Sequence, residues 1–280
     1  MKRTLNLLNA LLLAIQLSAL EYAHKPADPQ PTGWPLTAEE KAFIAKPEFE
    51  RRPGREVNKH LPHLWPAVPS AGFFGGDAWL KLHEAHVKTV EANQGPVDVL
   101  LVGDSITIQW GSSWSKHFPD RKAVNIGIGG DKTQNVLWRL DHGGVDGLKP
   151  RAIVLMIGNN NMFFTPETGV AAAAQGVKAC LANLREKFPE ADVVVAKILP
   201  CHAPKVRFYE DILLTNAEID KLKLDADPKV KVLDLTKDFL NEDGTIKLDL
   251  FTSDKIHLSL SGYEVYAQRL APLLKPALAR

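Results

Sequence analysis

Short apolar runs typical of buried strands alternate with helical patterns over most of this 280-residue chain. Parallel strands joined by helical crossovers form one sheet with helices on both of its faces. The pattern therefore predicts a three-layer α/β/α domain with a five-stranded parallel sheet over residues 75–280. The predicted strands are residues 97–102, 123–126, 152–157, 193–199 and 230–233, and the predicted helices are residues 77–92, 133–140, 165–188, 208–224 and 262–278.

Composition excludes several other classes of protein. Apolar residues make up 45% and charged residues 24% of the chain, which is ordinary for a globular protein. The formal net charge of +1 gives no general attraction to nucleic acid or to an anionic membrane surface. We therefore expect neither a nucleic-acid partner nor stable insertion into a membrane.

The N-terminus has the layout of a secretory signal peptide. Two basic residues precede an apolar run over residues 5–20, and Ala19 or Ala23 can occupy a cleavage site. The run is too short and too often interrupted by polar side chains to predict a membrane span. We predict a signal peptide at residues 1–23 and export to the periplasm or the cell exterior, with an amphipathic N-terminal helix as the alternative.

Residues 24–74 form a second distinct segment. Closely spaced prolines at its start favour an extended backbone, and aromatic side chains such as Trp34 and Trp65 are scattered along the rest. The aromatic residues indicate that this proline-rich extension packs on the body of the domain instead of forming a free linker.

A candidate nucleophile stands at the end of the first predicted strand, which runs directly into a Gly-Asp-Ser motif ending at Ser105. Open α/β sheets bind their ligands at the carboxyl ends of the strands. The Gly-x-Ser-x-Gly elbow is absent, because Thr107 takes the place of the second glycine. Near the C-terminus, Asp254 lies three residues before His257, so its carboxylate can accept from Nδ1–H and leave Nε2 as a base.

Two other loops offer hydrogen-bond donors at the same edge of the predicted sheet. The second strand is followed by Gly-Ile-Gly-Gly-Asp, which fails as a dinucleotide fingerprint because Lys132 occupies the place of the last glycine. The third strand ends in Gly-Asn-Asn-Asn at residues 158–161. Each motif alone is more often structural. Their succession after neighbouring strands predicts one crevice that holds a nucleophile, a base and oxyanion donors.

In this order, the motifs resemble those of the SGNH (GDSL-type) hydrolases. The resemblance covers about residues 95–275 and is greatest to the branch of the platelet-activating-factor acetylhydrolase catalytic subunits, through residues 125–140 and Leu199-Pro200. It implies a flavodoxin-like sheet with strand order 2-1-3-4-5.

The resemblance also implies a role for each candidate residue. Ser105 corresponds to the nucleophile, and Asp254 and His257 to the rest of a catalytic triad. The backbone N–H groups of Ser105 and Gly130 and the side-chain amide of Asn160 correspond to the oxyanion donors. The implied reaction is ester hydrolysis through an acyl-enzyme, which needs no metal or organic cofactor.

We expect a preference for acetyl or other short acyl groups on a bulky alcohol, such as an O-acetylated carbohydrate. The loops after the strands are short, with no long apolar insertion to enclose a lipid chain. Trp110 and Phe163 follow the first and third strands and are candidate substrate-binding residues. Core packing is an equal alternative for Phe163, whereas Trp110 is the better pocket candidate. Other hypotheses are a lysophospholipase or thioesterase, an acyltransferase, and a catalytically silent carbohydrate-binding protein.

Histidines and cysteines give weaker signals. The pairs His60-x-x-His63 and His83-x-x-His86 have spacing compatible with metal binding but lack the usual acidic or thiolate partners, so we predict no metal site. Cys180 lies well down a predicted helix and Cys201 follows the fourth strand, which separates them by roughly 20 Å at 1.5 Å rise per residue. We therefore expect both thiols to be free.

Overall fold

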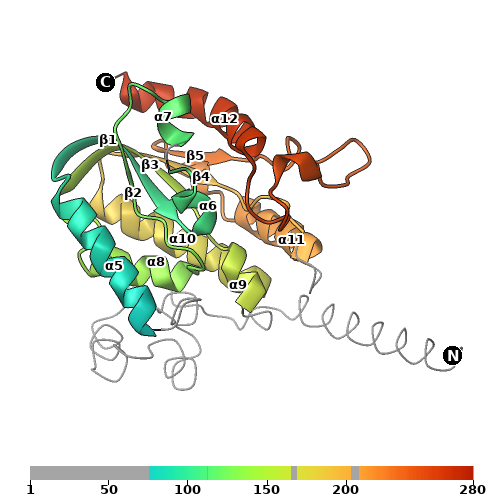
Figure 1. Ribbon diagram of the computed structural model, residues 1–280, viewed down its shortest axis with the longest axis horizontal. Coiled ribbons are helices and arrows are strands. Elements are labelled where there is room, and N and C mark those ends of the chain that lie inside the picture. Colours follow the sequence, from blue (N-terminus) through green and yellow to red (C-terminus); the bar gives the residue numbers. More distant parts are fainter. Residues whose placement is uncertain (1–75, 112, 165–168, 203–207, 280) are drawn as a thin grey trace, which may run out of the picture.

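The computed structural model describes residues 76–111, 113–164, 169–202 and 208–279. The predicted signal peptide and the proline-rich extension lie outside these residues. At the centre is a five-stranded parallel sheet in the order β2-β1-β3-β4-β5 (Figure 1). The strands are β1 (Gly95–Gly103), β2 (Ala123–Asn125), β3 (Leu148–Met156), β4 (Asp192–Ala196) and β5 (Val230–Leu233). The predicted fold and strand order are thereby confirmed.

A helix is present at each of the five predicted positions, whereas three short helices, α6 (Ser105–Ile108), α7 (Ser113–His117) and α9 (Asn159–Phe164), were not predicted. The α9 helix directly precedes residues 165–168, which lie outside the described residues, so the predicted start of the helix at 165–188 is not tested; α10 is described from Gly169 to Lys187. Gly158, with a φ of +125°, ends the extended backbone before α9. The helices are α5 (Gly76–Glu91), α6 (Ser105–Ile108), α7 (Ser113–His117), α8 (Thr133–Asp141), α9, α10 (Gly169–Lys187), α11 (Phe208–Lys221) and α12 (Leu260–Leu278), with 3-10 turns η2 (Leu224–Ala226) and η3 (Leu248–Leu250).

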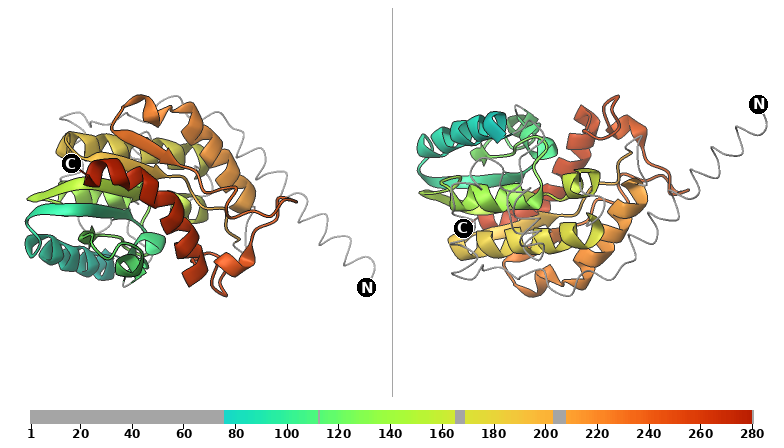
Figure 2. Two further views of the ribbon diagram at one scale, coloured as in Figure 1. Left: turned by 90° about the horizontal axis from the view of Figure 1, so that it is seen from above. Right: turned by 90° about the horizontal axis from the view of Figure 1, so that it is seen from below.

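Alternate side chains of the strands face two separate hydrophobic cores. Leu100 and Val102 of β1 pack with residues of α5, α8 and α10, whereas Val99 and Leu101 pack with residues of α7 and α12. Figure 2 shows α12 across one face of the sheet and α10 across the other. Both faces of the sheet are covered, which explains why its strands read as continuous apolar runs.

The carboxyl ends of β1, β2 and β3 meet at one edge of the sheet. Leu101 pairs with Asn125, and Gly103 pairs with Met156, so the three strands end at nearly the same level. The next residues along the chain are therefore the turn at Ser105 and the loops after β2 and β3. The fold gathers the three motifs that the sequence places far apart.

Within the described ranges, every helix is too short or too polar to cross a lipid bilayer.

Candidate active site

Ser105 is the first residue of α6, the single helical turn that follows β1. Asp104 caps this turn, because its carboxylate accepts a hydrogen bond of 3.0 Å from the backbone N–H of Ile106. Gly103 allows the α6 turn to lie close against the end of β3, since a Cβ at this position would overlap the side chain of Thr107 and a carbonyl of β3. Ser105 itself is half-buried, so the turn presents it at the edge of the sheet.

Asp254 and His257 are held together by hydrogen bonds within one short loop. Nδ1 of His257 lies 2.6 Å from Oδ2 of Asp254, whose Oδ1 accepts from the backbone N–H groups of Ile256 and His257, each at 2.9 Å. Partial burial acts to raise the pKa of Asp254. The hydrogen bonds, first of all that from the His257 ring, outweigh this effect and hold the pKa below its ordinary value. The carboxylate is therefore ionised and orients the imidazole.

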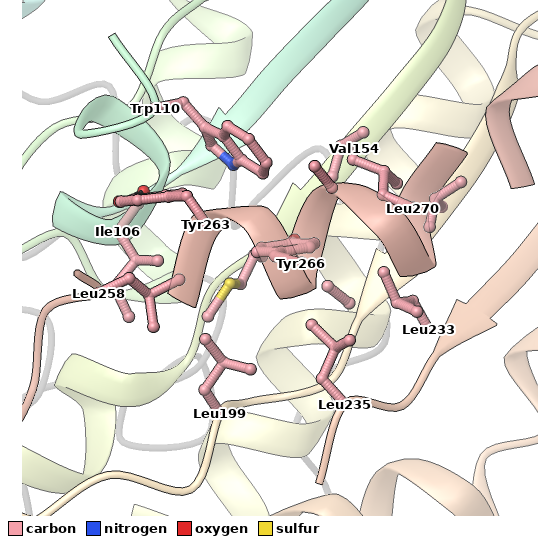
Figure 3. Packing of buried hydrophobic residues seen from close by; sticks show 14 of the residues in the cluster. Ile106, Trp110, Val154, Leu199, Leu233, Leu235, Leu258, Tyr263, Tyr266 and Leu270 are labelled. Atoms are coloured by element: carbon pink, nitrogen blue, oxygen red, sulfur yellow. Dashed lines mark hydrogen bonds between the residues drawn. The ribbon is translucent and has the colours of Figure 1, made fainter. Parts of the chain in front are cut away.

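The fold brings His257 to Ser105 from 152 residues away in the sequence. Nε2 of His257 lies 2.9 Å from Oγ of Ser105. Tyr263 in the first turn of α12 donates a hydrogen bond of 2.7 Å to the carbonyl of Ile106, and Figure 3 shows the two residues side by side. This contact ties the helix after His257 to the turn that carries Ser105. In this geometry a histidine can take the proton of a serine hydroxyl.

The loops after β2 and β3 contribute the predicted donors. Gly130 has a φ of +79°, a conformation that favours glycine. Asn160, in the first turn of α9, donates from Nδ2 to the carbonyl of Asp131 at 2.9 Å and lies 3.4 Å from Oδ2 of Asp104. These contacts place the amide of Asn160 between the loop after β2 and the residue that precedes Ser105. The structure thus gathers all the predicted catalytic and oxyanion residues at one edge of the sheet.

Two further carboxyl groups of this region are buried. Burial raises the pKa of Asp104 to about 7, and the nearby charge of Asp131 acts in the same direction. Burial also raises the pKa of Asp131 to about 6, although the guanidinium of Arg139 favours the ionised form. Nε and Nη2 of Arg139 lie 2.9 and 2.7 Å from Oδ2 of Asp131. This buried ion pair joins the loop after β2 to α8.

Sequence reasoning did not identify this ion pair or its third member, Trp79. The indole Nε1 of Trp79, on α5, donates a hydrogen bond of 2.6 Å to Oδ1 of Asp131. Asp131 closes the Gly-Gly-Asp motif, and Arg139 is a charged residue between the apolar Trp138 and Leu140 of α8, so both carried a weak signal. The role of Trp79 had no local signal, because helical spacing of aromatic residues is typical of any core-facing helix.

The structure corrects the expectation for Trp110. Its side chain is 2% exposed and packs in an aromatic cluster with Trp114, Phe118, Tyr263 and Tyr266, against the face of α12 that Figure 3 shows. Trp110 is a core residue, and the proposal that it lines an acyl pocket was wrong. A large aromatic side chain after a strand gains more from burial under a helix than from lining an open site. The side chain of Phe163 lies outside what the structure describes.

The described histidines of the candidate metal site have other surroundings. His83 stacks on Trp79, meets the edge of Trp138, and places Nε2 2.9 Å from the carbonyl of His142. Burial lowers the pKa of both His83 and His86 to about 4. Among the residues that the structure describes, no group of three metal-ligating side chains is brought together. The other pair, His60 and His63, lies outside the described residues.

Cys180 and Cys201 are free, as predicted, and both are buried. Burial raises the pKa of both thiols. The thiolate, which is the reactive form of cysteine, is therefore disfavoured at both positions.

Comparison with known proteins identifies the family of this chain. Residues 101–265 match the model of the GDSL-like lipase/acylhydrolase family. The chain is 32% identical over 209 residues to the human platelet-activating factor acetylhydrolase IB subunit alpha1, covering 74% of this chain and 87% of that protein. It is also 32% identical over 216 residues to the rat alpha2 subunit, covering 74% of this chain and 89% of that protein.

Solved structures share the fold. A GDSL-like lipase from Bacteroides thetaiotaomicron superposes with a TM-score of 0.59 at 18% identity, covering 70% of this chain and 98% of that one. The acetyl xylan esterase AlAXEase superposes with a TM-score of 0.52 at 21% identity, covering 63% of this chain and 99% of that one. With the family match over more than half of its residues, the chain belongs to the GDSL-like lipase/acylhydrolase family and is a carboxylic ester hydrolase.

Proposed function

We propose that this protein is a serine esterase in which Ser105, His257 and Asp254 form the catalytic triad. The observation that carries the proposal is the continuous set of contacts from Asp254 Oδ2 to His257 Nδ1, at 2.6 Å, and from His257 Nε2 to Ser105 Oγ, at 2.9 Å. Ser105 Oγ attacks the ester carbonyl while His257 takes its proton, and Asp254 stabilises the imidazolium that forms. His257 then gives this proton to the leaving alcohol.

The oxyanion of the tetrahedral intermediate is stabilised by the backbone N–H groups of Ser105 and Gly130 and by the side-chain amide of Asn160. One amide hydrogen of Asn160 is used by the carbonyl of Asp131, which sets the orientation of the group. The other is directed toward Asp104 across a long 3.4 Å contact. Because this second hydrogen bond is weak, transferring the hydrogen to the oxyanion costs little.

The acyl-enzyme is hydrolysed by the reverse sequence of proton transfers. His257 removes a proton from water, the hydroxide attacks the acyl carbonyl, and the collapse of the intermediate returns the proton to Ser105 Oγ. No metal or organic cofactor takes part in this scheme.

For the substrate, we propose acetyl or other short-chain esters, with O-acetylated carbohydrate as the preferred class. Relatives named as a platelet-activating factor acetylhydrolase and an acetyl xylan esterase support the acyl length and the bulky alcohol. The signal-peptide pattern at residues 1–23 supports a site of action outside the cytoplasm, where polysaccharides are found. Trp110 belongs to the core and is not part of the proposed acyl pocket.

A panel of aryl esters with acetyl, butyryl and octanoyl groups, beside acetylated xylan, tests the substrate proposal. We expect kcat/KM to be highest for acetyl and to fall with chain length. A steady rise toward octanoyl would instead favour a lysophospholipase or thioesterase. If an added alcohol acceptor captures most of the acetyl group, the protein is an acyltransferase with the same triad.

Covalent labelling with a fluorophosphonate tests the nucleophile. The wild-type protein should be labelled on Ser105, and Ser105→Ala should not react. An unlabelled but correctly folded wild-type protein would favour a catalytically silent carbohydrate-binding protein.

A further inference from the structure

A buried network centred on Asp131 connects α5 to both loops that carry the proposed oxyanion donors. The Asp131 side chain is completely buried, and Arg139 is 1% exposed. Arg139 binds Oδ2 of Asp131 with Nε and Nη2, while Trp79 donates to Oδ1 at 2.6 Å. A buried carboxylate requires donors on both oxygens, because it has lost its hydrogen bonds to water. Trp79 therefore supplies the donor that the ion pair leaves missing on Oδ1.

The same network fixes the backbone around Ser105. Arg139 Nη1 donates to the carbonyl of Ile126 at 2.7 Å, and Nη2 lies 3.4 Å from the carbonyl of Gly103. Ile126 directly follows β2 and Gly103 ends β1, the strands that lead to Gly130 and Ser105. Arg139 thus holds the start of the loop after β2, and Trp79 and Arg139 together hold its end at Asp131.

Asp131 is attached directly to two of the proposed oxyanion donors. It follows Gly130 in the chain, so a displacement of Asp131 moves the Gly130–Asp131 peptide group and, through the Cα of Gly130, the N–H of that residue. Its carbonyl accepts the hydrogen bond of 2.9 Å that orients the amide of Asn160. Any displacement of the Asp131 side chain is therefore transmitted to both donors.

We propose that Trp79 is a positioning residue of the oxyanion hole: its indole N–H holds Asp131, and Asp131 aligns Gly130 and Asn160. Trp79 lies outside residues 101–265, which match the family model, and comes from a helix 52 residues before Asp131. The proposal rests on the oxyanion roles given above and adds the group that keeps these donors in place. Donors aligned in advance are the source of transition-state stabilisation in such sites.

The first test is Trp79→Phe, with Trp138→Phe as the matched control. Trp138 belongs to the same aromatic stack, with its ring 5.3 Å from that of Trp79, and makes no described hydrogen bond to Asp131. We expect Trp79→Phe to lower kcat on an acetyl ester by about tenfold to a hundredfold with little change in KM, because misaligned donors weaken transition-state binding. Trp138→Phe should leave kcat within about threefold of wild type, because the hydrogen bond from Trp79 to Asp131 is still present in this variant.

The second test asks whether Trp79 acts through Asn160. In an Asn160→Ala background, Trp79→Phe should lower kcat by a clearly smaller factor than in the wild type, since one of the donors it aligns is already absent. Equal factors in the two backgrounds would show a general structural effect and overturn the proposal. An equal loss in Trp138→Phe and Trp79→Phe would overturn it as well.

Replacement of Trp79 by benzothienylalanine tests the N–H donor without making the side chain smaller, so the packing around position 79 is kept. It keeps the bicyclic shape but lacks the N–H donor, so kcat should fall as in Trp79→Phe, and wild-type kcat would refute the proposal. Ser105→Ala distinguishes a failure of the proposed function from a failure of the proposed role of Trp79. If it retains activity, the proposed function fails, whereas an inactive Ser105→Ala beside a fully active position-79 variant removes only the role of Trp79.

Discussion

The two groups of residues around Ser105 are built in different ways. The histidine loop, residues 252–260, is partly exposed, and the hydrogen bonds of Asp254 link near neighbours, two and three residues away. The described long-range hydrogen bonds of this loop are those of His257 with Ser105 and of the Lys255 carbonyl with the backbone N–H of His202. The donor loops, residues 125–131 and 159–161, are held by buried contacts between distant residues. Trp79 is 52 residues from Asp131, and Asn160 is 29 residues from it.

The carboxyl groups of the two regions reflect this difference. The side chain of Asp254 is 47% exposed, and local hydrogen bonds lower its pKa, so it remains ionised. Asp104 is 1% exposed, and burial raises its pKa to about 7. Local hydrogen bonding therefore preserves the charge that the proposed base requires. In the donor loops, burial makes the structure rigid, and a buried carboxyl group such as Asp131 stays ionised only with the help of a partner from another part of the fold.

The largest expected effect comes from removing either partner of the contact between Ser105 and His257, which joins the histidine loop to the Ser105 turn beside the donor loops. Ser105→Ala and His257→Ala should each reduce esterase activity to near background, about 10⁵-fold or more, because the members of a triad act as a unit. Steady-state rates of the purified variants on an acetyl ester check this. Activity of more than a few per cent in either variant would reject the assignment.

Asp254→Asn should affect the histidine loop without unfolding it. The amide oxygen can still accept from the N–H groups of Ile256 and His257, but the amide NH₂ opposes Nδ1–H of His257 and favours the wrong tautomer. We expect kcat to fall by about 10³–10⁴ with the melting temperature nearly unchanged. A large drop in melting temperature would mean that the loop is less self-sufficient than its hydrogen bonds indicate.

Asn160→Ala should have a smaller effect, confined to the donor side. Loss of one oxyanion donor lowers kcat by about 10²–10³, whereas KM changes little because the interaction strengthens in the transition state. Comparison of kcat and KM for the variant and the wild type separates the two roles. Normal kcat with a raised KM would make Asn160 a substrate contact only.

Asp104→Asn should change the dependence of stability on pH. The folded chain keeps a proton on Asp104 up to about pH 7, whereas the unfolded chain loses it near its ordinary pKa of ~3.9. This contribution to stability is fully present below the unfolded pKa and is lost as the pH rises through the folded pKa, by at most about 1.4 kcal/mol per pH unit.

The variant has no such proton, so its unfolding free energy should fall less than that of the wild type between about pH 4 and pH 7. Denaturant unfolding of both proteins at several pH values measures the difference. Parallel curves would mean that Asp104 titrates normally in the fold.

Prediction from sequence succeeded where the physical signal is local or periodic. The apolar runs led to the five strands, because burial on both faces of a parallel sheet leaves a nearly continuous apolar signature in its central strands. β5 also has the predicted bounds, although it lies at the edge of the sheet and exposes Lys231. The spacing of Asp254 and His257 was informative because one short turn suffices to bring them together. The short helix α9 was not predicted, since an Asn-rich segment suits a turn as well as a helix N-terminus.

The sequence by itself determined the α/β architecture, the position of Ser105 at a strand end and the Asp254–His257 pair, because these depend on periodicity and short-range hydrogen bonding. Only the tertiary structure decided that Trp110 lies in the core and that Trp79 reaches Asp131. An indole has the same local signature whether it packs, lines a pocket or donates a hydrogen bond. Which of these it does depends on the residues that other elements place around it, and for Trp79 that partner is a carboxylate whose burial requires a donor.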